Sequence, residues 1–202
     1  MQRVAAAVSV RNCLHNAAMD RTPVNEAKLI ETPAGRQAEG PGWFVVNMTE
    51  AAAIDTPNAG HAWTFSPAEG RFPHFGINVQ VLNPGEPSAK YHAEEGQEAF
   101  LVLQGEVRLF VEDEERILRQ WDFFYSPPWC AHVFVGGGDG PSAILMVGAR
   151  NAGEGLIYPR NEAAATYDAS AEQMTEKAEE AYAGWTRPVP ARKQWPPTGD
   201  RR

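Results

Sequence analysis

Cysteine is scarce in this sequence. The 202 residues contain only Cys13 and Cys130, whereas small secreted domains that depend on disulfides carry a dense set of cysteine pairs. We therefore expect no disulfide bridge and a chain that folds in the reducing cytoplasm.

Long apolar runs are missing as well. A membrane-spanning helix needs about twenty consecutive apolar residues, and no stretch comes near that length. The short run at residues 4–10 follows Arg3 and stops at Arg11, with no convincing cleavage site of small residues before Asn12. We expect a cytoplasmic protein with no membrane span and no export signal.

Basic residues are outnumbered by acidic ones. The sequence has 18 lysines and arginines against 26 aspartates and glutamates, a formal net charge of -8. Nucleic acids and anionic membranes both require a basic face, so neither is an expected partner. The hydrophobic share of 43% is enough for a single core, which indicates one main domain.

The first 42 residues lack a regular pattern. Residues 1–18 show no apolar period, and Met19 offers a second start, so we expect the segment before it to be dispensable for folding. Residues 22–42 contain Pro23, Pro33 and Pro41, a composition that favours irregular structure. We interpret residues 1–42 as an irregular N-terminal extension.

Strand signals fill residues 43–150. Ile77, Val79 and Val81 alternate with polar or small residues, as expected for a strand with one buried face. Further short runs rich in β-branched, aromatic or other apolar residues lie at 43–48, 100–103, 107–111, 121–125, 133–135 and 143–147. Short strands separated by turns are typical of an all-β antiparallel sandwich or barrel.

Residues 151–202 have a different character. Ser170 to Gln173 has the form of a helix capping box, and Met174, Ala178, Ala181 and Tyr182 follow on one helical stripe that stops at Gly184. This predicts one C-terminal helix of about thirteen residues that packs on the β domain. The tail from Trp185 holds prolines and tryptophans, and we expect it either to dock its tryptophans or to remain an arm.

Chemistry is concentrated between Pro84 and Gly105. His92, Glu94 and Glu98 lie just before an apolar run and are separated from one another by even numbers of positions. On a strand, side chains of one parity share a face. An imidazole and two carboxylates directed to one point suit a borderline divalent cation, although a solvated loop is the commoner reading of this stretch alone.

A second stretch, from Trp121 to Val135, favours the metal site over the solvated loop. Together the two resemble the paired motifs of the cupin superfamily, G-x5-H-x-H-x3,4-E-x6-G and G-x5-P-x-G-x2-H-x3-N. His92, Glu98 and Gly105 match the first motif in place, and Pro127 and His132 match the second. The departures are Gly85 one residue early, Glu94 in place of His, Trp121 and Trp129 in place of glycines, and Gly136 in place of Asn.

The resemblance covers roughly residues 77–149 and implies a double-stranded β-helix, the cupin jelly-roll barrel, at 43–150. The metal ligands that it implies are His92, Glu94, Glu98 and His132, around one divalent ion of zinc, manganese, iron or nickel. Glu94 is alternatively a catalytic base beside the ion. Cys130 either shares the inward face of His132 or is a buried, inert residue.

We expect a metalloenzyme that acts on a small organic substrate, aromatic or carbonyl-containing, as a dioxygenase or as an isomerase, cyclase or lyase. The alternative is a small-ligand-binding or sensing module without turnover. Gln97 and Tyr91 are the nearest candidates for residues that orient the ligands. The aromatic side chains Trp121, Phe123, Phe124, Tyr125 and Trp129 are expected either to wall the pocket or simply to pack in the core. Exposed sheet edges and long extensions predict a homodimer.

Overall fold

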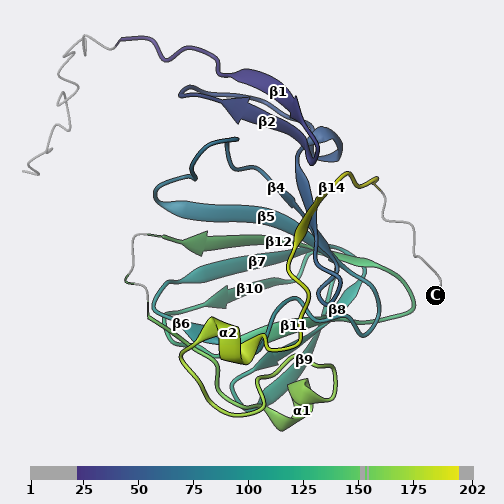
Figure 1. Cartoon of the computed structure of the whole chain (residues 1–202). Coiled ribbons are helices and arrows are strands. Elements are labelled where there is room, and N and C mark those ends of the chain that lie inside the picture. Colours follow the sequence, from purple (N-terminus) through teal and green to yellow (C-terminus); the bar gives the residue numbers. More distant parts are fainter. Residues whose placement is uncertain (1–21, 151–152, 154, 196–202) are drawn as a thin grey trace, which may run out of the picture.

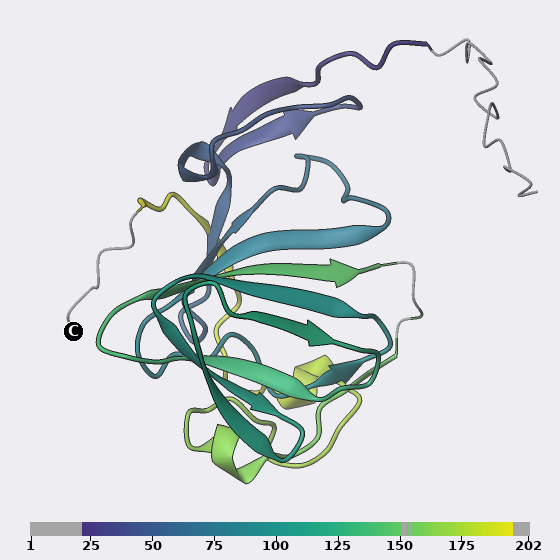
Figure 2. The ribbon, with the colours of Figure 1, turned by 180° about the vertical axis from the view of Figure 1, so that it is seen from behind.

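The computed structural model describes residues 22–150, 153 and 155–195. Residues 1–18, Met19 and Cys13 lie outside this part of the chain, so the expectations for them are untested. The described chain is mostly antiparallel β structure, arranged as a barrel of two sheets that face each other (Figures 1 and 2). The all-β double-stranded β-helix expected from the sequence is confirmed.

The larger sheet has seven strands. Its centre consists of β5 (Phe75–Leu82), β12 (Ser142–Ala149) and β7 (Glu98–Gln104), with β10 (Phe123–Ser126) at one edge. Beyond β5 follow β4 (His61–Thr64), β3 (Ala53–Asp55) and β14 (Val189–Ala191). Neighbouring strands are antiparallel throughout, although most of the neighbours are not consecutive in the chain.

The smaller sheet has three strands in the order β11, β8 and β9. These are β11 (His132–Gly136), β8 (Glu106–Val111) and β9 (Glu114–Arg119). Glu112 and Asp113 form the β8–β9 turn, where Glu112 adopts a left-handed conformation with φ 50°. A two-stranded piece of β6 (Ala93–Glu94) and β13 (Leu156–Ile157) lies at one end.

The core between the two sheets is built from alternating side chains. Its fully or nearly buried members are Leu82, Phe100, Val102, Val107, Leu109, Phe134 and Ile144. Burial of each such side chain contributes about 1.5–3 kcal/mol to folding. On β11, His132 and Phe134 contact this core, whereas Val133 and Val135 belong to a second cluster on the other face.

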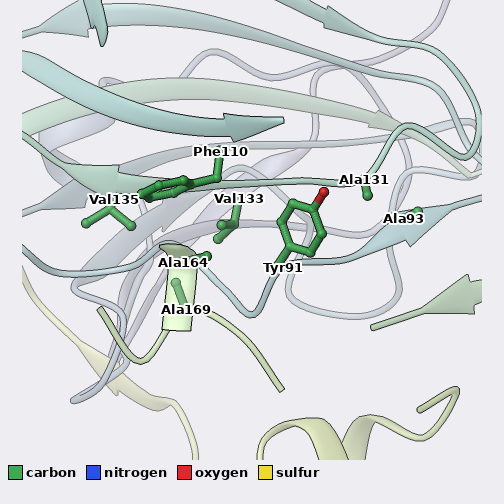
Figure 3. Close-up of a cluster of buried hydrophobic side chains, with 8 residues drawn as sticks. All are labelled: Tyr91, Ala93, Phe110, Ala131, Val133, Val135, Ala164 and Ala169. Atoms are coloured by element: carbon green, nitrogen blue, oxygen red, sulfur yellow. The ribbon is translucent and has the colours of Figure 1, made fainter. Parts of the chain in front are cut away.

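That second cluster explains why β11 is buried on both faces. Val133, Val135 and Phe110 pack against Tyr91 and against two alanines of the C-terminal region, Ala164 and Ala169 (Figure 3). Ala164 belongs to the short helix α1 (Glu162–Ala165), whose N-terminus is capped by the Asn161 side chain. The C-terminal region therefore covers the outer face of the smaller sheet.

Three local predictions were wrong, two of them for residues 22–48 and one for the C-terminal region. Residues 22–42 are not wholly irregular, because β1 (Lys28–Thr32) and β2 (Gly35–Glu39) form a hairpin with Pro33 in its turn. Residues 43–48 form no strand: Val45 is 76% exposed with no strand beside it, and Asn47 caps the 3-10 helix η1 (Met48–Glu50). β propensity does not produce a strand where no partner strand is available.

The predicted C-terminal helix is much shorter than expected. It is limited to α2 (Ala178–Ala181), while Met174 is 70% exposed and Thr175 pairs with Tyr158 in an isolated bridge. Tertiary contacts of this segment override the helical period. The described tail docks its tryptophans: Trp195 packs on Trp63, and Trp185 packs on Tyr182. None of the helices in the described residues is long and apolar enough to cross a membrane.

Candidate metal site

Three of the four predicted ligands converge inside the barrel. His92, Glu98 and His132 each offer one ligand atom, and these three atoms lie within 4.8 Å of one another. Glu98 begins β7, His132 begins β11, and His92 directly precedes β6. The strand order of the two sheets thus brings together residues that are far apart in sequence.

The two histidines are also paired through their main chains. The His92 N–H donates to the His132 carbonyl at 3.2 Å, and the His132 N–H donates to the His92 carbonyl at 2.9 Å. Their ring centroids lie 5.1 Å apart. This reciprocal pair fixes the spacing of the two imidazoles independently of any bound group.

Backbone carbonyls select the tautomer of both rings. Nδ1 of His92 lies 2.8 Å from the Lys90 carbonyl oxygen, and Nδ1 of His132 lies 3.0 Å from that of Cys130. A carbonyl oxygen can only accept a hydrogen bond, so each Nδ1 carries the proton. In the neutral rings, each Nε2 is then left with a lone pair, the arrangement found in metal-binding histidines.

Glu98 presents an unbalanced charge to these rings. Its Oε2 is buried and, among the described residues, makes no hydrogen bond, yet it lies 3.2 Å from Nε2 of His132. With Nδ1 protonated, two lone-pair atoms face each other across this gap. Either a second proton on His132 or a cation shared by both atoms relieves the repulsion, and the donor set suits a divalent metal.

Burial acts on the charge of the remaining site residues. It lowers the pKa of His92, with a further contribution from His132 nearby, so this imidazole favours its neutral, metal-binding form. Burial, together with the charge of Glu98, raises the pKa of Glu94 to about 7, partly opposed by His132. Glu94 lies in β6 and outside the group of three converging ligand atoms.

Aromatic rings line the site around His132. The ring of Phe100 lies 5.1 Å from the His132 ring, that of Phe124 5.7 Å and that of Phe134 6.2 Å. Phe100 and Phe134 were not predicted as site residues, although each has the same parity as the ligand on its own strand. Alternation along β7 and β11 was the signal that could have found them.

The predicted aromatic wall was mostly wrong. Of its five members, Phe124 packs against the core, whereas Trp121, Phe123, Tyr125 and Trp129 are about half exposed or more. On β10, Phe123 and Tyr125 have the parity opposite to that of Phe124, so they lie on the outer face. The consecutive aromatic residues concealed this alternation.

Trp121 and Trp129 stand where the cupin motif has glycine. Both adopt positive φ angles, 76° for Trp121 and 65° for Trp129, in the left-handed region that normally suits glycine. The turn geometry is therefore retained although the residue type is not. At Trp129 the turn places the backbone N–H 2.7 Å from the Glu94 carbonyl, which links the two ligand-bearing segments.

The other predicted neighbours contribute less than expected. The Tyr91 hydroxyl donates to the Glu112 carbonyl at 2.8 Å, and Gln97 accepts a hydrogen bond from Tyr125, so neither orients a ligand side chain through these contacts. Cys130 reaches His132 through its carbonyl, while burial raises the pKa of its thiol. Tyr158, with its ring 6.2 Å from that of His92, was missed because it comes from the distant C-terminal region.

Comparison with known proteins identifies the domain. Residues 78–148 match the family model described as the cupin domain. No curated protein matches the sequence. Among solved structures, a "cupin 2 domain-containing protein" from Halorhodospira halophila is 20% identical with a TM-score of 0.44; the match covers 54% of this chain and 75% of that one.

Two further solved structures are similar over part of the chain. The polyketide cyclase RemF from Streptomyces resistomycificus is 16% identical with a TM-score of 0.46, over 54% of this chain and 80% of that one. A protein from Acidithiobacillus ferrooxidans, provisionally called a sugar phosphate isomerase, is 28% identical with a TM-score of 0.38. The match covers 42% of this chain and only 54% of the Acidithiobacillus protein. With its barrel and its matched motifs, the chain carries a cupin domain at residues 78–148.

Proposed function

We propose that this protein is a metal-dependent cupin enzyme that holds one divalent ion with His92, Glu98 and His132 and acts on a small organic molecule. One observation carries the proposal: the buried Oε2 of Glu98 faces Nε2 of His132 at 3.2 Å without a hydrogen bond among the described residues. A carboxylate held in this way is costly unless a positive charge compensates it.

The ligand set suits several metals. Two neutral imidazoles and one carboxylate form the set used by non-haem ferrous oxygenases, and zinc, manganese and nickel accept the same donors. When bound, such an ion supplies Lewis acidity or, in the case of iron, the activation of dioxygen. The three residues leave coordination positions free for a substrate or water.

Glu94 is proposed as the catalytic base. It lies two residues from His92, and it feels the charges of both Glu98 and His132. A carboxyl group with a pKa of about 7 can accept or release a proton near neutral pH, as a general acid or base requires. The alternative role, as a fourth ligand, requires its side chain to approach the other three.

The surroundings favour a small and largely uncharged substrate. Phe100, Phe124 and Phe134 enclose His132, and aromatic rings suit apolar or aromatic ligands better than highly charged ones. We infer a substrate with an aromatic ring or a carbonyl group. The reaction is of the dioxygenase type or of the isomerase, cyclase or lyase type.

Metal content tests the proposal directly. Protein purified without chelator, or reconstituted anaerobically with zinc, manganese, iron or nickel, should hold close to one ion per chain by elemental analysis. A matched control is His74→Ala, because His74 is exposed and remote from the three ligands in sequence. No stoichiometric binding of any of the four metals would overturn the metalloenzyme assignment and leave a metal-free binding module.

Glu94→Gln separates the two roles of this residue. As a base, its loss should leave the metal content unchanged and lower turnover by about 100-fold or more. Turnover can be sought as oxygen uptake with a panel of small phenols and diketones, and as product formation in the absence of oxygen. Loss of the metal together with the activity would contradict the base assignment and make Glu94 a ligand.

We further propose that the protein is a homodimer. β10 is an edge strand, and its outer face exposes Phe123 at 63% and Tyr125 at 50%, next to Trp121 at 67%. Apolar side chains gathered on a sheet edge are typical of a protein interface. Light scattering at micromolar concentration should give twice the mass of the chain, and Phe123→Ser should lower it; a single-chain mass for the unmodified protein would exclude the dimer.

A further inference from the structure

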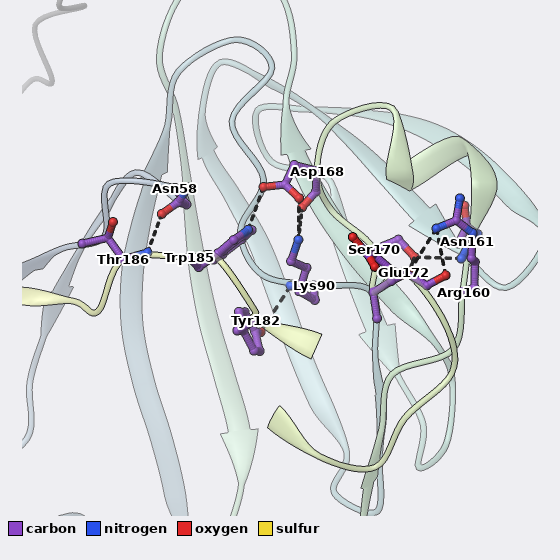
Figure 4. A network of polar contacts seen from close by, with 11 residues as sticks. Asn58, Lys90, Arg160, Asn161, Asp168, Ser170, Glu172, Tyr182, Trp185 and Thr186 are labelled. Carbon is purple, nitrogen blue, oxygen red and sulfur yellow. Dashed lines mark hydrogen bonds and ion pairs between the residues drawn. The ribbon is translucent and has the colours of Figure 1, made fainter. Parts of the chain in front are cut away.

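The C-terminal region is connected to the segment just before His92 by a polar network (Figure 4). Lys90 is only 3% exposed, and its ammonium group donates to the Asp168 carboxylate at 2.6 Å and to the Asp168 carbonyl at 2.8 Å. The Trp185 ring lies 4.6 Å from the same ammonium group, and its Nε1 donates to the other Asp168 carboxylate oxygen at 2.7 Å.

The same region holds the peptide unit between Lys90 and Tyr91. The N–H of Tyr91 donates to the Ala169 carbonyl at 2.6 Å. In a trans peptide the N–H and the C=O point in opposite directions, so this bond directs the Lys90 carbonyl away from Ala169. That carbonyl accepts the hydrogen bond from Nδ1 of His92 at 2.8 Å.

A third contact comes from Tyr182, at the C-terminal end of α2. The Lys90 N–H donates to the Tyr182 hydroxyl at 3.2 Å, and the Tyr182 ring packs edge-on against Tyr158. Lys90 and Asp168 also line a cavity of about 360 Å³.

We propose that Lys90, Asp168, Ala169, Tyr182 and Trp185 form a clasp that positions His92 for metal binding. The clasp fixes the Lys90 carbonyl, the carbonyl fixes the proton on Nδ1 of His92, and Nε2 is thereby kept free for the metal. These are positioning residues, because none of them is among the three ligands. The expected change in metal affinity rests on the proposed function, whereas the expected tautomer of His92 does not.

This arrangement gives the C-terminal region a role in the site. Partners that orient metal-binding histidines typically contribute about 10–100-fold to metal affinity. Lys90 and Asp168 are 78 positions apart in sequence, so the clasp forms only when the C-terminal region docks. Metal affinity is thereby coupled to the docking of residues 168–185.

Lys90→Met is the direct test. It keeps the length of the buried stem and removes the ammonium group, and Asp168 can rehydrate because its side chain is 64% exposed. The matched control is Lys193→Met, which removes another 2.6 Å ion pair, with Asp55 at the end of β3. If Lys90→Met fails to fold, Asp168→Gly serves instead, since glycine accepts the φ of 55° at this position.

The first readout needs no metal. In metal-free protein at pH 8 labelled with ¹⁵N-histidine, NMR should show His92 of the unmodified protein and of Lys193→Met as a single tautomer with the proton on Nδ1. Lys90→Met, or Asp168→Gly, should show a mixture of tautomers. A single Nδ1–H tautomer in the clasp variant would overturn the inference.

The second readout is zinc affinity, measured by competition with a chromophoric chelator. The clasp variant should bind zinc about 10–100-fold more weakly than the unmodified protein, and Lys193→Met should bind it equally well. Equal affinity in all three proteins would contradict the clasp. If the unmodified protein binds no zinc or other metal while the tautomers behave as expected, the proposed function fails and the positioning of His92 stands.

Discussion

Two regions of this molecule contain a partly or fully buried histidine beside charged groups, and only one has the features of a metal site. Inside the barrel, His92 and His132 meet Glu98, and each ring is oriented by a backbone carbonyl. On the outer face of the large sheet, His61 packs edge-on against Trp63 with 5.1 Å between ring centroids, close to the Lys193–Asp55 ion pair.

Unpartnered polar atoms occur in both regions. Within the described residues, Nε2 of His61 and Nε1 of Trp63 are buried without a hydrogen bond, as is Oε2 of Glu98. Inside the barrel, two oriented imidazoles and a carboxylate converge on one point. In the outer region, no second histidine of the described residues lies beside His61. A buried imidazole alone is therefore a poor indicator of a metal site, and the pairing of two oriented rings with a carboxylate is a better one.

The largest expected difference between the two regions is in metal binding. His132→Ala removes one ligand and the main oriented partner of Glu98, so we expect metal affinity to fall by at least about 1000-fold; losing about 4 kcal/mol corresponds to that factor. His61→Ala should leave the affinity unchanged. Isothermal titration with zinc compares the two variants, and equal losses would remove the distinction.

Replacing a large buried side chain by alanine should lower stability in both regions, but only the replacement inside the barrel should weaken metal binding. Trp63 and Phe134 are both essentially inaccessible to solvent, so replacement of either by alanine should lower the free energy of unfolding by about 3–5 kcal/mol. Phe134→Ala should also weaken zinc binding, because its ring packs on His132, whereas Trp63→Ala should not. Urea denaturation and zinc titration measure the two effects; unchanged zinc affinity in Phe134→Ala would show that this ring does not support the site.

Removing the charge of Glu98, inside the barrel, should raise the stability of the protein, whereas removing that of Asp55, in the outer region, should lower it. Glu98→Gln removes a buried charge and offers an amide N–H to Nε2 of His132, so the metal-free protein should gain about 1 kcal/mol of stability. Asp55→Asn weakens a partly exposed ion pair and should cost up to about 1 kcal/mol. Melting temperatures measured in the presence of a chelator test this, and a destabilised Glu98→Gln protein would indicate that His132 already carries a second proton.

The smallest effect concerns pH and the outer histidine. Burial, with a further contribution from Lys193, lowers the pKa of His61 below its usual 6.5, so the folded state favours the neutral ring. The unfolded chain gains a proton as pH falls through 6.5, so the stability contributed by neutral His61 is present above that pH and is lost below it. His61→Gln should therefore show a flatter stability profile between pH 7.5 and 5; parallel profiles would contradict this.

Sequence reasoning succeeded where local pattern and tertiary environment agree. The alternation of Ile77, Val79 and Val81 predicted β5, and the motif spacing nominated His92, Glu98 and His132, which the fold brings together. The β1–β2 hairpin was missed because the three prolines of residues 22–42 indicated irregular structure, although Pro33 occupies the turn and the other two lie outside the hairpin.

The parts that sequence could not supply depend on distant contacts. The inward and outward faces of β10 cannot be read from consecutive aromatic residues, so the pocket wall was misplaced. The clasp joins Lys90 to Asp168 and Trp185 across long sequence separations. No periodicity within either segment encodes that contact, since it arises only from the docking of one folded part on another.

The reciprocal main-chain pair between His92 and His132 also has a consequence for when metal can act during folding. The ligands come from segments 40 positions apart, as the numbering of this pair shows, and an unfolded chain holds them together only rarely because closing such a loop is entropically costly. A metal ion would therefore bind after the β strands have paired, and it would stabilise the finished barrel by mass action without assisting its nucleation. Added metal should accordingly slow unfolding and leave the rate of refolding almost unchanged.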